Sequence, residues 1–77
     1  SADYFAIAVM EIDEDTGQGT LVHSYQGLGS LSKHVKYLTY LLDMFNVVFI
    51  CIDNAGADVF VDTCNESAEF KKLNYNI

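Results

Sequence analysis

The sequence contains no proline and no arginine, and none of its apolar runs is long. Residues 47–52 form a run of six and residues 4–10 a run of seven, whereas a membrane-spanning helix needs about 18 or more. The first residues also lack the basic segment that opens a signal peptide. The 77 residues therefore predict neither a membrane span nor a secretory signal.

Positive charge is scarce, and this limits the partners that the chain can attract by itself. Four lysines stand against eleven acidic residues, which gives a net charge of −7. A protein that binds nucleic acid through its own surface usually carries a basic patch. If the chain touches nucleic acid, either metal ions offset its acidic residues or the basic surface is supplied from elsewhere.

Apolar side chains are abundant. Hydrophobic residues make up 51% of the chain and aromatic residues 13%, which is enough for a core and too much for a disordered tail. We expect one small domain, residues 1–77, that buries only about 60% of its unfolded surface. The cysteines, Cys51 and Cys64, are too few for a disulfide framework, so we expect free thiols in a cytosolic protein. Cys51 is expected to pack inside its apolar run.

The pattern of apolar and polar residues predicts an α/β fold with the order β-β-α-β-α. The expected elements are an antiparallel hairpin of strands at about 4–12 and 20–26, a helix at about 30–45, a strand at about 47–52 and a helix at about 56–64. Ser30 is the expected N-cap of the first helix. Because a helix precedes it, the strand 47–52 is expected to lie parallel to the first strand or one vacant strand position away from it. After Glu66 the pattern indicates another strand or a loosely packed end.

The same pattern predicts the core. The residues expected to be mostly buried are Phe5, Ile7, Val9, Leu31, Val35, Leu38, Leu42, Val48, Ile50 and Ile52. Val59 and Phe60 are expected to face inward from the second helix. Both histidines, His23 and His34, are expected at the surface or at the boundary of the core.

The residue best placed for chemistry is Asp53, which ends the predicted strand 47–52 and precedes a glycine turn. Ligands of open α/β sheets gather at the carboxyl ends of strands. A carboxylate there can hold a hard cation such as Mg²⁺, which takes one or two carboxylates and keeps several waters. Alternatively, Asp53 only caps the helix that begins near Ala55, since aspartate is a favoured N-cap. Asp58 and Asp62 are four residues apart and therefore share a face of that helix. This face is either part of a metal site or simply exposed to solvent.

Two runs stand out together, DYFAIAVM at residues 3–10 and IDNAGADVFVD at residues 52–62, with a predicted hairpin and an amphipathic helix between them. In these features the chain resembles the nuclease domain of the large terminase subunits, the viral DNA-packaging motors. The resemblance spans roughly residues 2–65. Asp53 matches the second catalytic acid of the family, and Asp62 stands where the family has a further acid. Asp3 matches a recurrent acid with no clear catalytic role.

The resemblance implies an RNase H-like fold and cleavage of phosphodiester bonds by two metal ions, Mg²⁺ or Mn²⁺, with Asp53 as catalytic residue and metal ligand. The family's first catalytic aspartate lies on a central strand that would precede Ser1, and its third lies downstream. The chain would thus be a fragment of the domain, lacking its first strand, its C-terminal part and a complete active site. Through the parent protein it would act on double-stranded DNA, with other terminase or portal subunits as partners and no membrane, in the cytoplasm of the infected host cell.

Two functions from other classes stay open on the residues alone. One is a non-catalytic acidic interaction protein that mimics DNA, which would spread its acids along one surface at phosphate spacing. The other is a nucleotide-binding βαβ unit. Residues 27–32, GLGSLS, resemble a G-x-G-x-x-G turn, and Asp53 would end the following strand. A serine replaces the third glycine, and the preceding strand is polar for a buried parallel strand.

Overall fold

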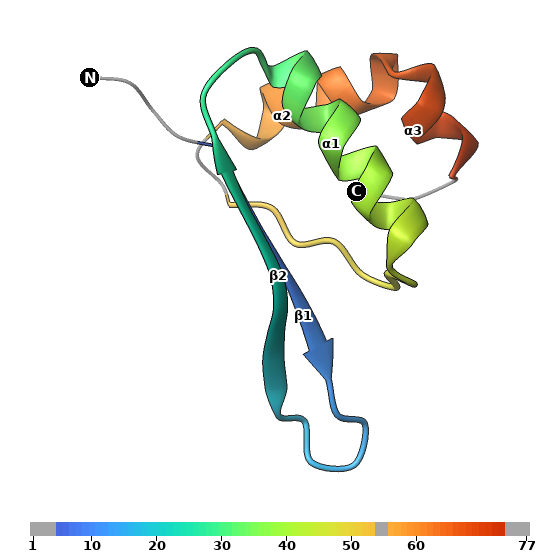
Figure 1. Cartoon of the computed structure of the whole chain (residues 1–77). Helices are drawn as coiled ribbons and strands as arrows, with labels where there is room; N and C mark the ends of the chain where they lie inside the picture. The colour runs from blue at the N-terminus through green and yellow to red at the C-terminus, as the bar shows by residue number, and fades with distance from the viewer. Residues whose placement is uncertain (1–4, 54–55, 74–77) are drawn as a thin grey trace.

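The computed structural model describes residues 5–53 and 56–73. A two-stranded antiparallel sheet is followed by helices, in the order β1 (Phe5–Ile12), β2 (Gly19–Gly27), α1 (Leu31–Met44), α2 (Ala57–Glu66) and α3 (Ala68–Lys72) (Figure 1). The mixed α/β composition, the hairpin and the first two helices agree with the sequence-based prediction. Tyr4, with which the first strand was expected to start, lies outside the described residues. None of the described helices has the length and apolar character needed to cross a bilayer.

The hairpin changes register midway. Val9 lies opposite His23 and Met10 lies opposite Leu21, so Val22 is the extra residue of a β-bulge. On the side of the bulge nearer the helices, alternate side chains of both strands face α1 and are half-buried. The other half extends past the helices (Figure 1) and exposes four apolar side chains, Met10, Ile12, Leu21 and Val22.

The hairpin loop is built around the carboxylate of Asp13. One of its oxygens accepts hydrogen bonds from the backbone N–H groups of Asp15 and Thr16, at 2.9 and 3.0 Å. Gly17 completes the loop with φ of 74°, a left-handed conformation that suits glycine. These contacts lower the pKa of Asp13, chiefly through the bond from Thr16 and then through that from Asp15. The folded loop therefore favours the charged form of Asp13.

We expect Asp13→Ala to lower the melting temperature near neutral pH, because two backbone N–H groups lose their acceptor. The pKa of Asp13 is lower in the folded than in the unfolded chain, so its contribution exists above the ordinary value of 3.8 and is lost as pH falls through the folded value. Melting curves at neutral and strongly acidic pH should show the gap between variant and wild type closing in acid. The matched control is Asp15→Ala, which removes an exposed carboxylate of the same loop; an equal effect from it would contradict the assignment.

Helix α1 forms where the apolar residues recur at helical spacing. Ser30 is its N-cap, as predicted, and the Ser30 hydroxyl accepts a hydrogen bond from the Lys33 N–H at 3.3 Å. The core cluster packs on one stripe of this helix. Its buried members are Val35, Leu38, Leu42, Phe60, Cys64 and Phe70, and the half-buried side chains packed against it include Phe5, Ile7, Leu31, Ile50 and Ile52.

Helices α2 and α3 cover the other side of this core and differ in detail from the expectation. Phe60 is buried as predicted, but Val59 is 61% exposed, because α2 is rotated so that Phe60 and Cys64 face α1. The end of the chain is neither strand nor loosely packed in its described part. Instead, Ser67 caps the short α3 by accepting the Phe70 N–H at 3.2 Å, and the Phe70 ring is buried in the core.

Residues 47–52 do not form a strand, so the predicted order β-β-α-β-α is wrong at its fourth element. The segment is elongated, and within the described residues it pairs with neither strand of the hairpin. It runs opposite to β1 and in the direction of β2 (Figure 1), so it is not the parallel neighbour of the first strand. The physical reason is that a strand needs a hydrogen-bonded neighbour, and in the described part of the chain the only partner of β1 is β2.

The core also differs from the prediction along this segment. Ile50 and Ile52 are half-buried against the core cluster, but Val48 is 88% exposed and the adjacent Phe49 is 76% exposed. Cys51 is exposed as well, contrary to the expectation that it packs as a small hydrophobe, whereas Cys64 is buried. Both thiols are free, as expected. The segment thus presents strand-forming apolar residues to solvent.

Candidate functional site

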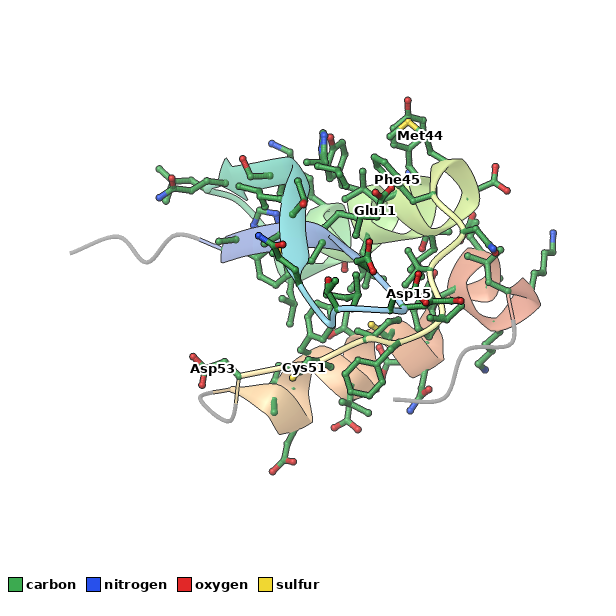
Figure 2. The ribbon with its side chains drawn as sticks, turned by 90° about the horizontal axis from the view of Figure 1, so that it is seen from below. Glu11, Asp15, Met44, Phe45, Cys51 and Asp53 are labelled. Atoms are coloured by element: carbon green, nitrogen blue, oxygen red, sulfur yellow. The ribbon has the colours of Figure 1, made fainter. Side chains whose placement is uncertain are left out.

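Asp53 lies where the elongated segment leads into α2. Its side chain is exposed (Figure 2), and the N-cap of α2 is Gly56, with φ of 73° and no side-chain capping bond. Asp53 is therefore not the N-cap residue of α2. Asn54 and Ala55, which separate it from this turn and belong to the run shared with the terminase family, lie outside the described residues.

Two further acidic side chains follow on α2. Asp58 lies in the first turn, where a negative charge is favourable at a helix N-terminus, and Asp62 follows one turn later. Both are exposed, as expected for a solvated helix face. Among residues 5–53 and 56–73, no three His, Cys, Asp or Glu side chains come together as a metal-binding group. Figure 2 shows Asp53 well away from Glu11 and Asp15, so the acids of the hairpin do not complete a site with it.

A cluster of hydrogen-bonded tyrosine and histidine side chains lies between β2 and α1. The Tyr25 hydroxyl and His34 Nδ1 are 3.0 Å apart, and His23 Nε2 and the Tyr37 hydroxyl are also 3.0 Å apart. Between these two hydrogen-bonded pairs the rings of Tyr25 and Tyr37 stack, with centroids 4.2 Å apart. The four side chains fix the hairpin against the helix.

His34 is buried, with 3% of its surface exposed, which contradicts the expected surface or boundary position. The Phe5 ring stacks on the His34 ring at 4.5 Å between centroids and an interplanar angle of 5°. Phe5 also stacks on Phe60 of α2, with 5.3 Å between ring centroids. The Phe5 ring therefore joins the hairpin to α1 and to α2. The hydrogen bond to Tyr25 offsets the cost of burying the imidazole.

Sequence reasoning missed this arrangement, although it leaves a trace in the sequence. His23 and Tyr25 alternate on a strand, and His34 and Tyr37 are three apart on a helix, so each pair lies on one face of its element. The pattern shows which residues share a face. It does not show that the two faces meet, because that depends on how the hairpin folds back on the helix.

The nucleotide-binding alternative requires a parallel βαβ unit. Residues 27–32 are not part of such a unit. β2 pairs antiparallel with β1, and Ser30 uses its hydroxyl to cap α1. The segment after α1, which would supply the second parallel strand, is unpaired with the hairpin in the described part of the chain. The dinucleotide-binding geometry is therefore not formed.

Comparison with known proteins found no matching family model, no matching curated protein and no matching solved structure.

Proposed function

We propose that the chain is part of a metal-dependent DNA endonuclease domain of a viral genome-packaging terminase, and that Asp53 is one of its metal-binding carboxylates. The observation that supports this most is the apolar segment 47–52, which joins neither strand of the hairpin in the described part of the chain and ends in an exposed Asp53. A strand-forming segment that exposes Val48 and Phe49 indicates that a neighbouring strand belongs beside it. The nuclease fold of the terminase family has such a strand, and it carries another catalytic acid.

The directions of the chain segments are consistent with one vacant strand position between β1 and residues 47–52. β1 runs opposite to the elongated segment (Figure 1), and only one edge of β1 is paired within the described residues, by β2. A strand inserted there could pair antiparallel with β1 and parallel with residues 47–52. The second pairing is the arrangement expected for a strand that follows a helix. The catalytic carboxylate carried by that strand would then lie near Asp53.

The chemistry of Asp53 suits one ligand position of Mg²⁺ or Mn²⁺. The carboxylate offers hard oxygen donors, and its exposure leaves room for the waters that Mg²⁺ keeps. Two metal ions bound there would supply an activated water and stabilise the leaving oxygen of the phosphodiester. Asp53 would hold one cation by its charge, at the end of the segment. The remaining ligands would come from the parent protein.

The arrangement of the acids disfavours a protein that mimics DNA. One group, Asp13, Glu14 and Asp15, lies in the hairpin loop, and the other extends from Asp53 along α2. The loop projects beyond the helices, so the two groups are separated by the length of the hairpin (Figure 1). A DNA mimic would need them in one continuous row.

The proposal is tested by metal removal from the parent protein. We expect the purified protein to nick and linearise plasmid DNA with Mg²⁺ or Mn²⁺, and to lose this activity in EDTA. Restoring Mn²⁺ should restore cleavage, while Ca²⁺ should support DNA binding with little cleavage, because catalysis depends on the geometry of the metal. Cleavage that persists unchanged in EDTA would rule out the proposed chemistry.

A further inference from the structure

A hollow of about 460 Å³ lies between the end of β2 and the first half of α1. Its lining includes three tyrosines and two lysines, namely Tyr25, Tyr37, Tyr40, Lys33 and Lys36, together with Leu28 of the connecting loop. Half of the four lysines of the chain are in this lining, and none of the described lining residues is acidic, although the chain has a net charge of −7. The lining of the hollow is therefore less acidic than the protein as a whole, although the Glu69 carboxylate of α3 interacts electrostatically with Lys36.

The lysines and two of the tyrosines share one stripe of α1. Lys33, Lys36, Tyr37 and Tyr40 are spaced at i, i+3, i+4 and i+7, which places them on one face of the helix. Side chains three apart have their Cβ atoms about 5–6 Å from each other. Both ammonium groups can thus approach one phosphate or two consecutive phosphates of a nucleic-acid strand.

The tyrosine side chains that line the hollow are held in place by ring stacking and by hydrogen bonds to the two histidines. Tyr25 and Tyr37 stack on each other, and their hydroxyl groups are hydrogen-bonded to His34 and His23. Tyr40 packs beside Tyr37 with ring centroids 5.8 Å apart and is 57% exposed. The outermost ring therefore offers an accessible face on a fixed support, the arrangement on which an unpaired base stacks.

We propose that this hollow binds an unpaired stretch of a DNA strand, with a base stacked on Tyr40 and the backbone phosphates near Lys33 and Lys36. The inference rests on the proposed nuclease function and adds to it a surface that holds substrate outside the metal site. An unpaired strand fits better than a duplex, because only an unstacked base exposes the face that an aromatic ring can cover. The segment carrying Asp53 reaches α2 toward the end of the hairpin where β2 also ends (Figure 1), but on the opposite side of β1 from β2 (Figure 2), so the hollow is a surface separate from the proposed metal site.

The test is binding of a fluorescein-labelled oligothymidylate of about 12 nucleotides to the purified parent protein in EDTA, followed by fluorescence anisotropy over a range of salt concentrations. The variant Lys33→Gln/Lys36→Gln should bind more weakly at low salt and lower the salt slope by about 1.4, since each phosphate contact on a single strand contributes about 0.7. Tyr40→Leu should weaken binding about 5- to 150-fold with an unchanged salt slope, because it removes stacking and keeps charge and bulk.

The matched control is Lys71→Gln/Lys72→Gln on α3, which changes the net charge equally and leaves the hollow intact. An equal loss of affinity in this control would overturn the proposal, as would wild-type affinity of Tyr40→Leu. An equal loss of affinity for a duplex of the same length in Tyr40→Leu, or displacement of the oligonucleotide by polyglutamate at similar concentration, would show that the surface does not select unpaired bases and would also overturn it.

The outcomes separate this proposal from the proposed function. If the protein never cleaves DNA but its binding depends on the three residues as described, the hollow is a nucleic-acid site and the nuclease assignment fails. If cleavage requires metal and Asp53 while all the hollow variants bind normally, the nuclease assignment stands and the hollow is not a DNA site.

Discussion

Asp53→Ala is expected to abolish Mg²⁺- or Mn²⁺-dependent cleavage of DNA by the parent protein while the fold remains intact. The side chain is exposed and outside the core cluster, so its removal should leave the melting temperature nearly unchanged. Even residues that only support metal ligands cost about 10- to 100-fold when mutated, so the loss of a direct ligand should exceed this range. Asp53→Asn should have nearly the same effect, because it preserves the shape and removes the charge.

Asp58→Ala and Asp62→Ala are the matched controls for this experiment. Each removes one carboxylate from the α2 region, as Asp53→Ala does, but both positions lie on an exposed helix face. Plasmid nicking at equal protein and metal concentrations should be much less affected in these two variants. If Asp53→Ala cleaves as well as wild type, the proposed nuclease loses its one matched catalytic residue. If all three variants are equally impaired, the effect is general electrostatics and Asp53 has no special role.

Leu38→Ala should lower the free energy of unfolding by about 2–5 kcal/mol, a large part of the stability of a small domain. Leu38 is 7% exposed and packs within the cluster that α1 forms with α2 and α3. Truncation removes apolar contacts and leaves a cavity that the surrounding helices fill only in part. Urea unfolding followed by circular dichroism measures the change.

Val59→Ala serves as the control for Leu38→Ala, since Val59 is on a helix of the same layer but 61% exposed. We expect a change within about 0.5 kcal/mol from this substitution. A loss below about 1 kcal/mol for Leu38→Ala would show that α1 turns a different face to the core.

The parts of the fold that sequence predicted well are those specified by nearby residues. The capping Ser30 and the stripe of Val35, Leu38 and Leu42 define α1 within a single segment, and the structure shows that helix with its cap. The hairpin was predictable for the same reason, since two alternating strands and a polar loop with glycine are adjacent in the chain. The β-bulge at Val22 left no comparable signal.

The errors concern contacts between distant segments. Residues 47–52 have the apolar, β-branched composition of a buried strand. A strand also needs a hydrogen-bonded partner, and the sequence of the segment does not show whether the fold provides one. His34 was misplaced because its residue type suggests the surface, while its actual burial depends on Phe5 and Tyr25, which belong to the two strands of the hairpin. The position of Asp53 at the end of its segment was predictable, whereas the groups that would join it in a site were not.

The two cysteines allow transient opening of the helical layer to be measured by thiol modification. Burial raises the pKa of the Cys64 thiol to about 11, so almost none of it is the reactive thiolate near neutral pH, and its location between α1 and α2 shields it from reagents. Cys51 is exposed and open to reaction in the folded state. An alkylating reagent would therefore modify Cys51 at once, and Cys64 only when the helices separate. The slow phase of thiol modification would thus measure how often the helical layer opens, without any label having to be introduced.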